Sequence, residues 1–450
     1  MSSRACSLQG VSKPQSYWQL EIMIQRSLIE DLRSGVLTLP EFIAQVGARF
    51  LEYEPSVLAF LPEEDRFTRL YEEAETLILS YPDLIKRPLL FGALAGVKDI
   101  FHVEGFTTQA GSRLPSDLFQ GDEAKSVTRL KEAGALIFGK TVTTEFAYFS
   151  PGPTRNPHNP EHTPGGSSSG SAAAVAAGFC HLTLGTQTIG SIIRPASFCG
   201  VVGLKPTYDR ISREGVIPLS PSLDHVGFFV PDVESAIDAA RILYNDWEEP
   251  TQPLKKPRLG IPDGPYLQSA SKEGLIHFEK VCKLLEDAGY ELQHIQVMSD
   301  FAEIRACHDV IMSAETAQVH ADWFGKYENL YSTKFTELIH RGQSIPCDQL
   351  QNALAACDEF RADIRRTFLD QNIDLWICPS TVGPAPKGLD STGDPVMNLP
   401  WTQAGLPVIN IPVGKNQASL PMGLQVIGNW YKDESLLFWA KDVEKTMANL

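Results

Sequence analysis

The passage over residues 165–207 constrains the fold of this chain more than any other part of the sequence. It reads GGSSSGSAAAVAAGFCHLTLGTQTIGSIIRPASFCGVVGLKPT and is dense in serine, glycine and alanine. The alanine-rich run over residues 171–177 predicts a short helix, because alanine is the strongest helix former. Glycine- and serine-containing turns precede and follow that run. We expect the helix to bring the two polar turns close together, and we expect the chemistry of the protein to lie there.

The first half of the chain predicts an α/β protein. Residues 17–80 place apolar side chains at helical spacing, which indicates several amphipathic helices laid against the outside of a core. An apolar strand is expected within residues 89–101, a helix over 123–133 and a further strand over 135–138. This strand, helix, strand order is typical of a largely parallel sheet.

The second half repeats the same order. A polar, proline-rich segment over residues 246–257 is the best internal boundary. Long helices are expected over residues 301–323 and 348–370, and a helix over 432–447 closes the chain. The continuous apolar run over 373–378 predicts a strand that is buried on both faces.

Composition and charge exclude several classes of function. With 450 residues, 43% of them hydrophobic, the chain can bury a large core, as a soluble globular protein does. The net charge of −16 and the lack of clustered lysine and arginine weigh against a nucleic-acid partner. No apolar run has the length of a signal peptide or a membrane span, so a cytoplasmic protein, monomeric or homodimeric, is expected.

The cysteines indicate neither disulfides nor a metal site. The eight cysteines are scattered, without a C-x-x-C pair or a Cys/His spacing suited to zinc. They are interpreted as reduced thiols, most of them small buried hydrophobic side chains. We expect no metal and no cofactor.

Two short motifs within the organising passage have weak alternative interpretations. The sequence GSSSG over residues 166–170 matches a nucleophile elbow centred on Ser168, but a loop rather than a strand precedes it. A phosphate-binding loop is disfavoured, because the lysine of G-x-x-x-x-G-K-[ST] is missing. Taken singly, such turns are more often structural than catalytic.

Three segments together resemble the amidase signature family of Ser-cisSer-Lys hydrolases. They are GVKDI over residues 96–100, GGSSSGSAAAVAAG over 165–178, and GTQTIGSIIRPASFCGVVGLKPT over 185–207. The likeness runs from about residue 89 to the C-terminus. It also includes TTEFA over residues 143–147, WTQAGLP over 401–407 and MGLQVIG over 422–428.

The resemblance implies an α/β fold. We expect one amidase-signature domain with a large, mixed, mostly parallel twisted sheet and helices on both faces. Its core lies at about residues 89–230. Residues 81–450 form the domain, and residues 1–80 form an N-terminal helical segment packed on it.

Mapped residue by residue, the resemblance implies a catalytic triad of Lys98, Ser167 and Ser191. Ser191 is the nucleophile, Ser167 is the bridging serine with a cis peptide bond, and Lys98 is the base. The assignment is physically sound, since a serine hydroxyl needs a base to become nucleophilic, and burial can lower the pKa of a lysine by several units. Singly, each residue could also be structural: Lys98 in a surface ion pair, Ser167 as a helix cap and Ser191 in an ordinary turn.

The nucleophile turn departs from the commonest family pattern, G-S-D-T-G-G-S-I-R. Gln187 replaces an acidic residue, Ile189 replaces a glycine, and Arg194 comes one position later. We expect Gln187 to keep hydrogen bonds but no ion pair, and Ile189 to shape the pocket rather than adopt a conformation reserved for glycine. The expected oxyanion-hole residues are Thr188, Ile189, Gly190 and Ser191. The expected substrate-pocket residues are Tyr148, Phe149, Ile189, Trp401 and Thr402, for which core packing is an equal alternative.

Several other polar residues are interpreted as structural. His158 and His162 lie in a loop rich in proline and asparagine, where hydrogen bonding is favoured over catalysis. Glu145 is expected to be a hydrogen-bond partner, and Cys199 a packed thiol.

The sequence therefore predicts a cofactor-independent hydrolase that cleaves amide C–N bonds through a Ser191 acyl-enzyme. Its substrate would be a small amide, and carbamates (urethanes) or esters are further options. One alternative is the A-type subunit of a tRNA-dependent amidotransferase, which acts in a complex. A second is a non-catalytic binding protein on the same fold.

Overall fold

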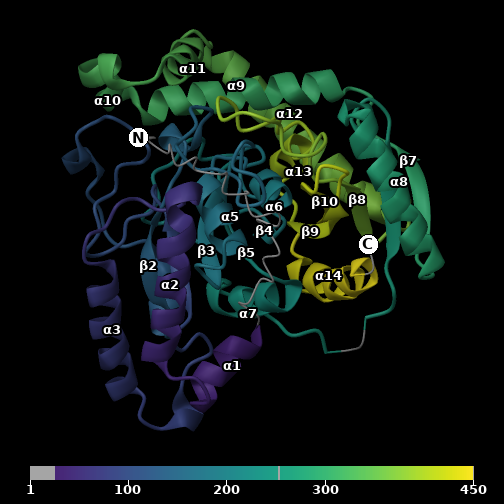
Figure 1. Ribbon diagram of the computed structural model, residues 1–450. Coiled ribbons are helices and arrows are strands. Elements are labelled where there is room, and N and C mark those ends of the chain that lie inside the picture. Colours follow the sequence, from purple (N-terminus) through teal and green to yellow (C-terminus); the bar gives the residue numbers. More distant parts are fainter. Residues whose placement is uncertain (1–25, 252–253, 449–450) are drawn as a thin grey trace, which may run out of the picture.

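A ten-stranded sheet runs through the part of the chain that the computed structural model describes, residues 26–251 and 254–448 (Figure 1). The strands are β1 (Leu94–Lys98), β2 (Leu136–Thr141), β3 (Leu182–Gln187), β4 (Val202–Lys205), β5 (His225–Val230), β6 (Arg258–Asp263), β7 (Glu291–Gln296), β8 (Leu375–Pro379), β9 (Val408–Lys415) and β10 (Pro421–Ile427). Their order across the sheet is β2-β1-β3-β5-β4-β9-β10-β8-β6-β7. Strands from both halves of the chain therefore share one sheet.

Helices surround this sheet. The α-helices are α1 (Arg26–Ser34), α2 (Leu39–Val57), α3 (Arg66–Ser80), α4 (Lys125–Glu132), α5 (Ser169–Ala176), α6 (Ile193–Cys199), α7 (Val233–Leu243), α8 (Lys272–Asp287), α9 (Phe301–Val319), α10 (Ala321–Tyr327), α11 (Thr333–Gln343), α12 (Cys347–Asp370), α13 (Leu399–Gln403) and α14 (Asp433–Met447). The short 3₁₀ turns are η1 (Leu84–Lys86), η2 (Ser116–Phe119), η3 (Glu145–Ala147), η4 (Leu267–Ser269) and η5 (Glu328–Leu330). The helix expected over 301–323 is divided into α9 and α10 at His320.

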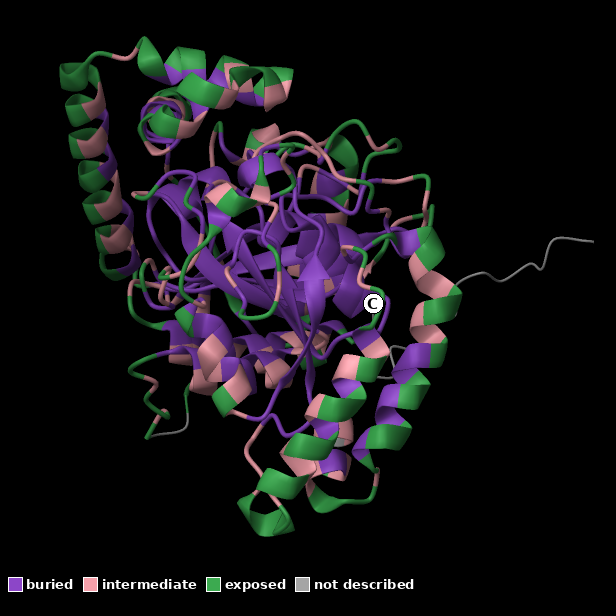
Figure 2. Ribbon diagram, turned by 90° about the vertical axis from the view of Figure 1, so that its left-hand side faces the viewer, coloured by how far each residue is buried: buried purple, intermediate pink, exposed green. Residues whose placement is uncertain are grey.

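Helices cover both faces of the sheet, as expected for an α/β protein. Buried side chains of α4, α7, α8 and α14 form one hydrophobic cluster, and those of α2, α3, α5, α6 and α13 form another. Figure 2 shows the strands at the centre of the sheet buried and the outer sides of the surrounding helices exposed, while the edge strand β7 is mostly exposed. This two-sided cover explains why an inner strand such as β8 is apolar and buried along its whole length, whereas the edge strand β7 is largely polar.

The sheet is mixed, but its centre is antiparallel rather than mostly parallel. Parallel pairs lie at the two ends, β2-β1-β3 and β8-β6-β7, and every pair between β3 and β8 is antiparallel. The prediction of mostly parallel strands was wrong at the centre of the sheet, because no helix lies between β4 and β5, or between β9 and β10. Strands joined without a crossover pair in opposite directions.

Helix α5 lies against the sheet at a close approach that only small residues permit. All of its residues are buried. A Cβ atom on Gly170 would lie 2.2 Å from the carbonyl oxygen of Ala59 and 2.4 Å from the amide nitrogen of Val142. The alanine-rich run therefore forms the predicted helix and packs it directly on neighbouring backbone, at the centre of the fold.

The N-terminal helices α1, α2 and α3 lie together on one side of the molecule (Figure 1). Helix α2 begins with a capping box, in which Thr38 Oγ1 accepts from the Glu41 amide and the Glu41 carboxylate accepts from the Thr38 amide. The expected amphipathic helices are therefore present from residue 26 onward. Residues 17–25 lie outside the described part of the chain.

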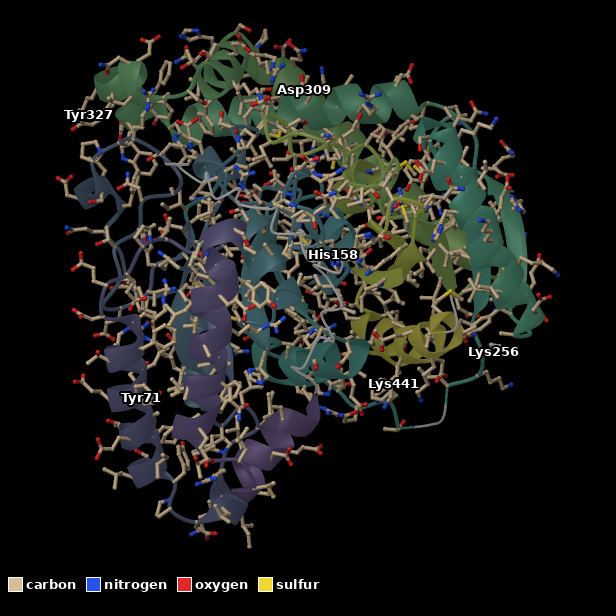
Figure 3. All side chains as sticks on the ribbon, viewed as in Figure 1. Tyr71, His158, Lys256, Asp309, Tyr327 and Lys441 are labelled. Atoms are coloured by element: carbon tan, nitrogen blue, oxygen red, sulfur yellow. The ribbon has the colours of Figure 1, made fainter. Side chains whose placement is uncertain are left out.

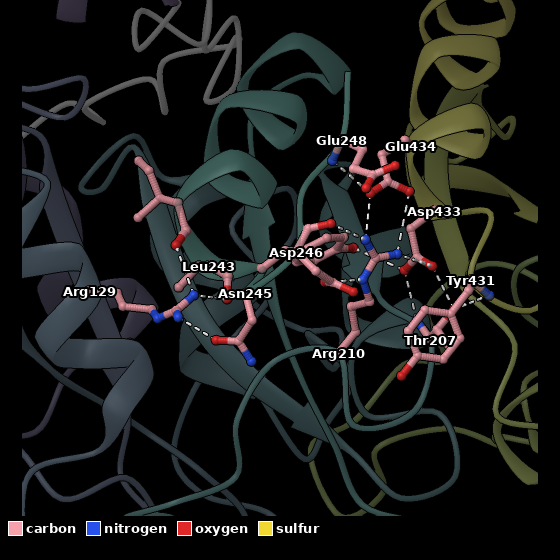
Figure 4. Close-up of polar contacts among 12 residues, drawn as sticks. Arg129, Thr207, Arg210, Leu243, Asn245, Asp246, Glu248, Tyr431, Asp433 and Glu434 are labelled. Carbon is pink, nitrogen blue, oxygen red and sulfur yellow. Dashed lines mark hydrogen bonds and ion pairs between the residues drawn. The ribbon is translucent and has the colours of Figure 1, made fainter. Parts of the chain in front are cut away.

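The C-terminal helix α14 is fastened to the loop after β4 by a network of charges (Figure 4). The Arg210 guanidinium pairs with Asp246, Asp433 and Glu434. Asp433 also accepts hydrogen bonds from the amide and the hydroxyl of Thr207, at 2.8 and 2.6 Å.

Among the described residues, no helix combines the length and the apolar composition needed to cross a bilayer.

Candidate active site

Lys98 ends strand β1 with its terminal nitrogen buried in the protein. The side chain is fully buried. Its Nζ lies 2.7 Å from Ser167 Oγ and 2.7 Å from Thr186 Oγ1. Burial lowers the pKa of Lys98 well below its usual value, and the nearby Asp224 carboxylate opposes part of that effect. The environment thus favours the neutral amine, which can accept a proton.

Ser167 lies in the loop that leads into α5. The peptide bond between Gly166 and Ser167 is cis, as the resemblance implies. The Arg194 side chain holds this segment, because its Nη2 donates to the carbonyl oxygen of Gly166 at 2.7 Å. A Cβ atom on Gly166 would meet Thr392 Cγ2 at 2.6 Å, so the loop is tightly enclosed. Ser167 is therefore held against Lys98 by contacts from several distant segments.

Ser191 lies in the turn between β3 and α6 and shares a narrow slot with Ser167. The slot has a volume of about 10 Å³. The side chain of Ser191 is almost fully buried, and its Oγ hydrogen-bonds to none of the described residues. The structure thus brings all three predicted catalytic residues to one place: Lys98 touches Ser167, and Ser167 and Ser191 line the same slot.

The turn that precedes α6 is held by the amide side chain of Gln187. Its Oε1 accepts hydrogen bonds from the backbone amides of Ile192 and Ile193, at 2.8 and 3.0 Å. Its Nε2 donates to Thr402 Oγ1 at 2.9 Å. A neutral glutamine therefore satisfies the first amides of α6, as the sequence predicts, without an ion pair.

The backbone of this turn presents unpaired N–H groups. Within the described chain, the amides of Ile189, Gly190 and Ser191 donate to no acceptor. Ile189 does not adopt a positive φ, so its β-branched side chain fits the turn without the left-handed conformation that favours glycine. At Gly190 a Cβ atom would lie 2.4 Å from Asn398 Oδ1, so this position requires glycine for space.

The predicted pocket residues divide into two groups. Tyr148, Phe149 and Ile189 line the slot together with Ser167 and Ser191. Two further predicted residues, Trp401 and Thr402, do not line it.

Trp401 and Thr402 lie behind the turn instead. Trp401 is fully buried and donates from Nε1 to the hydroxyl of Tyr266 at 2.8 Å. Thr402 donates to the carbonyl oxygen of Ile189 at 2.6 Å. Helix α13, which carries both, thus supports the nucleophile turn from its rear.

Two buried polar residues at the site were missed by the sequence analysis. Thr186 contacts Lys98, and Asp224 accepts from Thr188 Oγ1 at 2.6 Å and from the amides of Leu219 and Ser220. Burial raises the pKa of Asp224 to about 6. Thr186 lies inside the quoted GTQT motif, where its polar side chain two residues before the turn was an available signal. Asp224 lies outside the segments that carry the family resemblance.

The remaining polar residues are held in structural contacts. His158 Nε2 lies 2.9 Å from the carbonyl oxygen of Cys199, and His162 Nδ1 lies 2.7 Å from that of Ala385. Figure 3 shows His158 near the middle of the view, among closely packed side chains. Burial lowers the pKa of His158 to about 4, which keeps the ring neutral.

Ser168 and Glu145 likewise have structural partners. Ser168 is fully buried, and its Oγ donates to the carbonyl oxygen of Thr186 at 3.2 Å. The Glu145 carboxylate accepts from the backbone amide of Ser332 at 3.0 Å. Over the described residues, no group of three or more histidine, cysteine, aspartate or glutamate side chains is arranged to hold a metal ion. The arrangement that remains is a buried amine, a bridging hydroxyl, a free hydroxyl and a row of unpaired amides, which suits attack on a carbonyl carbon.

Comparison with known proteins identifies the relatives of this chain. The family model described as Amidase matches residues 65–437. The A-type subunit of the glutamyl-tRNA(Gln) amidotransferase of Prochlorococcus marinus (strain NATL2A) is 31% identical, over 94% of this chain and 97% of that protein.

Solved structures agree with this match. A crystal structure of an amidase is 28% identical and superposes with a TM-score of 0.85, over 94% of this chain and 99% of the other. The peptide amidase of Stenotrophomonas maltophilia, at 24% identity and a TM-score of 0.76, covers 96% of this chain and 97% of its own, and shares the fold.

Proposed function

The chain belongs to the amidase family and is a hydrolase of C–N bonds other than peptide bonds, and on that premise we propose that it is a self-sufficient amidase with a Lys98, Ser167 and Ser191 triad. The observation that carries the proposal is the contact between the buried Lys98 Nζ and Ser167 Oγ, beside a slot that Ser167 shares with Ser191. Its substrates are small amides, and carbamates or esters are secondary substrates.

The proposed reaction moves one proton along the triad and back. Neutral Lys98 takes the proton of Ser167, and Ser167 takes the proton of Ser191 as the Ser191 oxygen bonds to the carbonyl carbon. Ser167 then gives a proton to the leaving nitrogen as the C–N bond breaks, and Lys98 restores the proton of Ser167. Water repeats the sequence on the acyl-enzyme and releases the acid.

Negative charge that develops on the carbonyl oxygen needs donors fixed in advance. The unpaired amides of Ile189, Gly190 and Ser191 supply them in this proposal, together with that of Thr188. Thr402 and Gln187 hold the turn from behind, so the donors need not reorganise during the reaction. This rigidity supports an oxyanion hole despite the isoleucine at position 189.

The proposal is tested by assaying the purified chain alone. Primary amides, N-substituted amides, carbamates and esters with matched acyl groups are incubated without ATP or any other protein, and released amine, ammonia or alcohol is measured. We expect turnover of at least one amide series. Absence of turnover across the panel would reject the proposal.

The second candidate function is that of an amidotransferase component that works in a complex. It is favoured by the A-type amidotransferase subunits that match over 82 to 94% of the chain at 30 to 32% identity. In that case hydrolysis by the isolated chain would be weak and confined to glutamine, and would rise when partner proteins are added. Efficient turnover of simple amides by the isolated chain would exclude it.

Gly190→Ala is expected to lower kcat about a hundredfold, which is the typical loss when an oxyanion donor is displaced. The added Cβ would collide with Asn398 Oδ1 and push the turn away from its place. Steady-state kinetics on one amide provide the measurement. Gly325→Ala is the matched control, because no heavy atom lies within 4 Å of a Cβ built there. Equal kinetics in the two variants would contradict a role for this turn.

Asp224→Asn is expected to move the acidic limb of the kcat–pH profile to lower pH. The Asp224 carboxylate raises the pKa of Lys98, so its neutralisation lowers that pKa and leaves the base neutral at lower pH. The measurement is kcat from pH 5 to 10. Asp99→Asn is the control, since Asp99 follows Lys98 in the sequence but pairs with Lys140 at 2.9 Å. A limb that stays in place, or moves to higher pH, would show that Lys98 is not the group that titrates.

A further inference from the structure

A second cavity adjoins the slot that holds Ser191. Its volume is about 250 Å³. Ala147, Thr188 and Leu219 line both the cavity and the slot. Its wall also includes Thr186, whose hydroxyl contacts Lys98 Nζ at 2.7 Å. The cavity therefore lies directly beside the predicted catalytic residues.

The volumes of the two spaces differ by more than an order of magnitude. The slot, at about 10 Å³, is no larger than the space for one water molecule. It leaves no room for a bulky substituent of the amide. A cavity of about 150 Å³ is large enough to bind benzene, so the 250 Å³ cavity accommodates an aryl ring or a short alkyl chain.

The wall of the cavity is mainly apolar. Ile100, Val216, Ile217 and Val226 contribute aliphatic side chains to it. Of its ionisable wall residues, His225 is kept neutral because burial lowers its pKa well below the usual value, and its Nδ1 lies 2.7 Å from the carbonyl oxygen of Leu223. The Asp224 carboxylate accepts from Thr188 and from two backbone amides.

Arg213 is the cationic residue in the wall of this cavity, and its guanidinium already has partners. Arg213 pairs with Asp209 and donates to the carbonyl oxygen of Pro221. No described lining residue therefore offers an unused cation to a carboxylate, and the Asp224 charge repels one. The wall suits an uncharged apolar group.

Resting on the proposed function, we propose that this cavity binds the acyl group of the substrate, and that the preferred acyl group is an uncharged aryl or short alkyl chain. The proposed path of the proton determines which end of the substrate enters the cavity. Ser167 protonates the leaving nitrogen, so the nitrogen and its substituent lie on the side of the slot that Ser167 lines. Ser167 does not line the cavity, whereas Thr188 of the nucleophile turn does. The carbonyl substituent therefore extends into the cavity.

The test compares two substrate series on cavity variants. One series has primary amides with acyl groups of two, four and six carbons and benzoyl, and the other has acetamides with N-substituents of the same sizes. Val216→Trp narrows the rim, and Ile217→Ala enlarges the interior. Val36→Trp and Ile85→Ala are matched controls, because Val36 and Ile85 are 77% and 91% exposed. Thermal unfolding checks that each variant is folded.

For Val216→Trp we expect the ratio of kcat/KM for the six-carbon acyl amide to that for acetamide to fall about tenfold or more. Ile217→Ala should move the best acyl length upward, and neither control should change the ratio. Ile217→Ala keeps the test decisive if the tryptophan variant does not fold.

Two outcomes overturn the inference while leaving the proposed function intact. In one, the acyl ratios of both folded cavity variants stay within twofold of the wild type. In the other, only the N-substituted series responds. Failure of the proposed function has a different signature, namely a wild-type protein that hydrolyses no member of either series and is not labelled at Ser191 by a serine-reactive phosphonate.

Discussion

Ser191→Ala is expected to reduce amide turnover by about 10⁴-fold or more, to the background of the reaction in water plus substrate binding. The reason is chemical: without Oγ there is no atom to form the acyl-enzyme. Because this Oγ hydrogen-bonds to no described residue, its loss should leave the thermal stability almost unchanged. The measurement combines kcat on the best amide with labelling by a fluorophosphonate or sulfonyl fluoride and peptide mapping.

The competing nucleophile, Ser168, provides the matched control. Its buried Oγ donates to a backbone carbonyl, so Ser168→Ala should cost about 1 kcal/mol of stability but leave labelling at Ser191. Labelling of Ser168 in the wild type, or turnover retained in Ser191→Ala, would reject the proposed mechanism. If no serine of the wild type is labelled by the serine-reactive probe, the non-catalytic alternative is favoured.

Lys98→Met is expected to lower kcat about 10²- to 10⁴-fold, the range typical of a lost general base. Methionine fills most of the buried volume and removes the amine that lies against Ser167 and Thr186. In the wild type, kcat should rise with pH through the lowered pKa of Lys98, because only the neutral amine accepts the proton. In Lys98→Met that rise should disappear, which a kcat–pH profile measures directly.

Lys205→Met separates this effect from the mere loss of a buried lysine. Lys205 is also fully buried, at the end of β4, and burial lowers its pKa to about 7. Its Nζ donates to the carbonyl oxygens of Pro206 and Leu406, and Lys205 lines neither the slot nor the adjoining cavity. We expect Lys205→Met to lower the melting temperature but to leave the kcat–pH profile of the folded protein unchanged. If Lys205→Met loses the rise of kcat with pH in the same way as Lys98→Met, Lys98 is not the catalytic base.

The sequence predicted the parts of the site that lie within local motifs. Lys98, Ser167 and Ser191 each follow from a short segment, and the structure brings the three together. Their catalytic roles stay predictions until the variants are measured. Tyr148, Phe149 and Ile189 were also expected in the pocket and do line the slot.

Other features depended on contacts between segments far apart in the chain. Thr402 lies more than 200 positions from the turn that it supports, so its place beside motif residues could not reveal that it faces the rear of that turn. Asp224 influences Lys98 only because the loop after β4 folds back over the end of β3. No pattern in the neighbouring sequence indicates such a contact.

The passage over residues 165–207 illustrates the division. By itself, the sequence determined that a small-residue helix separates two polar turns, that helices and apolar strands alternate, and that Ile189 replaces a glycine. These are local properties, set by side-chain size and hydrophobic spacing. The tertiary structure alone decided that the centre of the sheet is antiparallel, that Gln187 and Thr402 hold the Ile189 turn without a left-handed residue, and that a 250 Å³ cavity opens beside it. Strand direction, burial and empty volume all depend on which distant segments pack together, and the residues next to one another in the chain do not determine that.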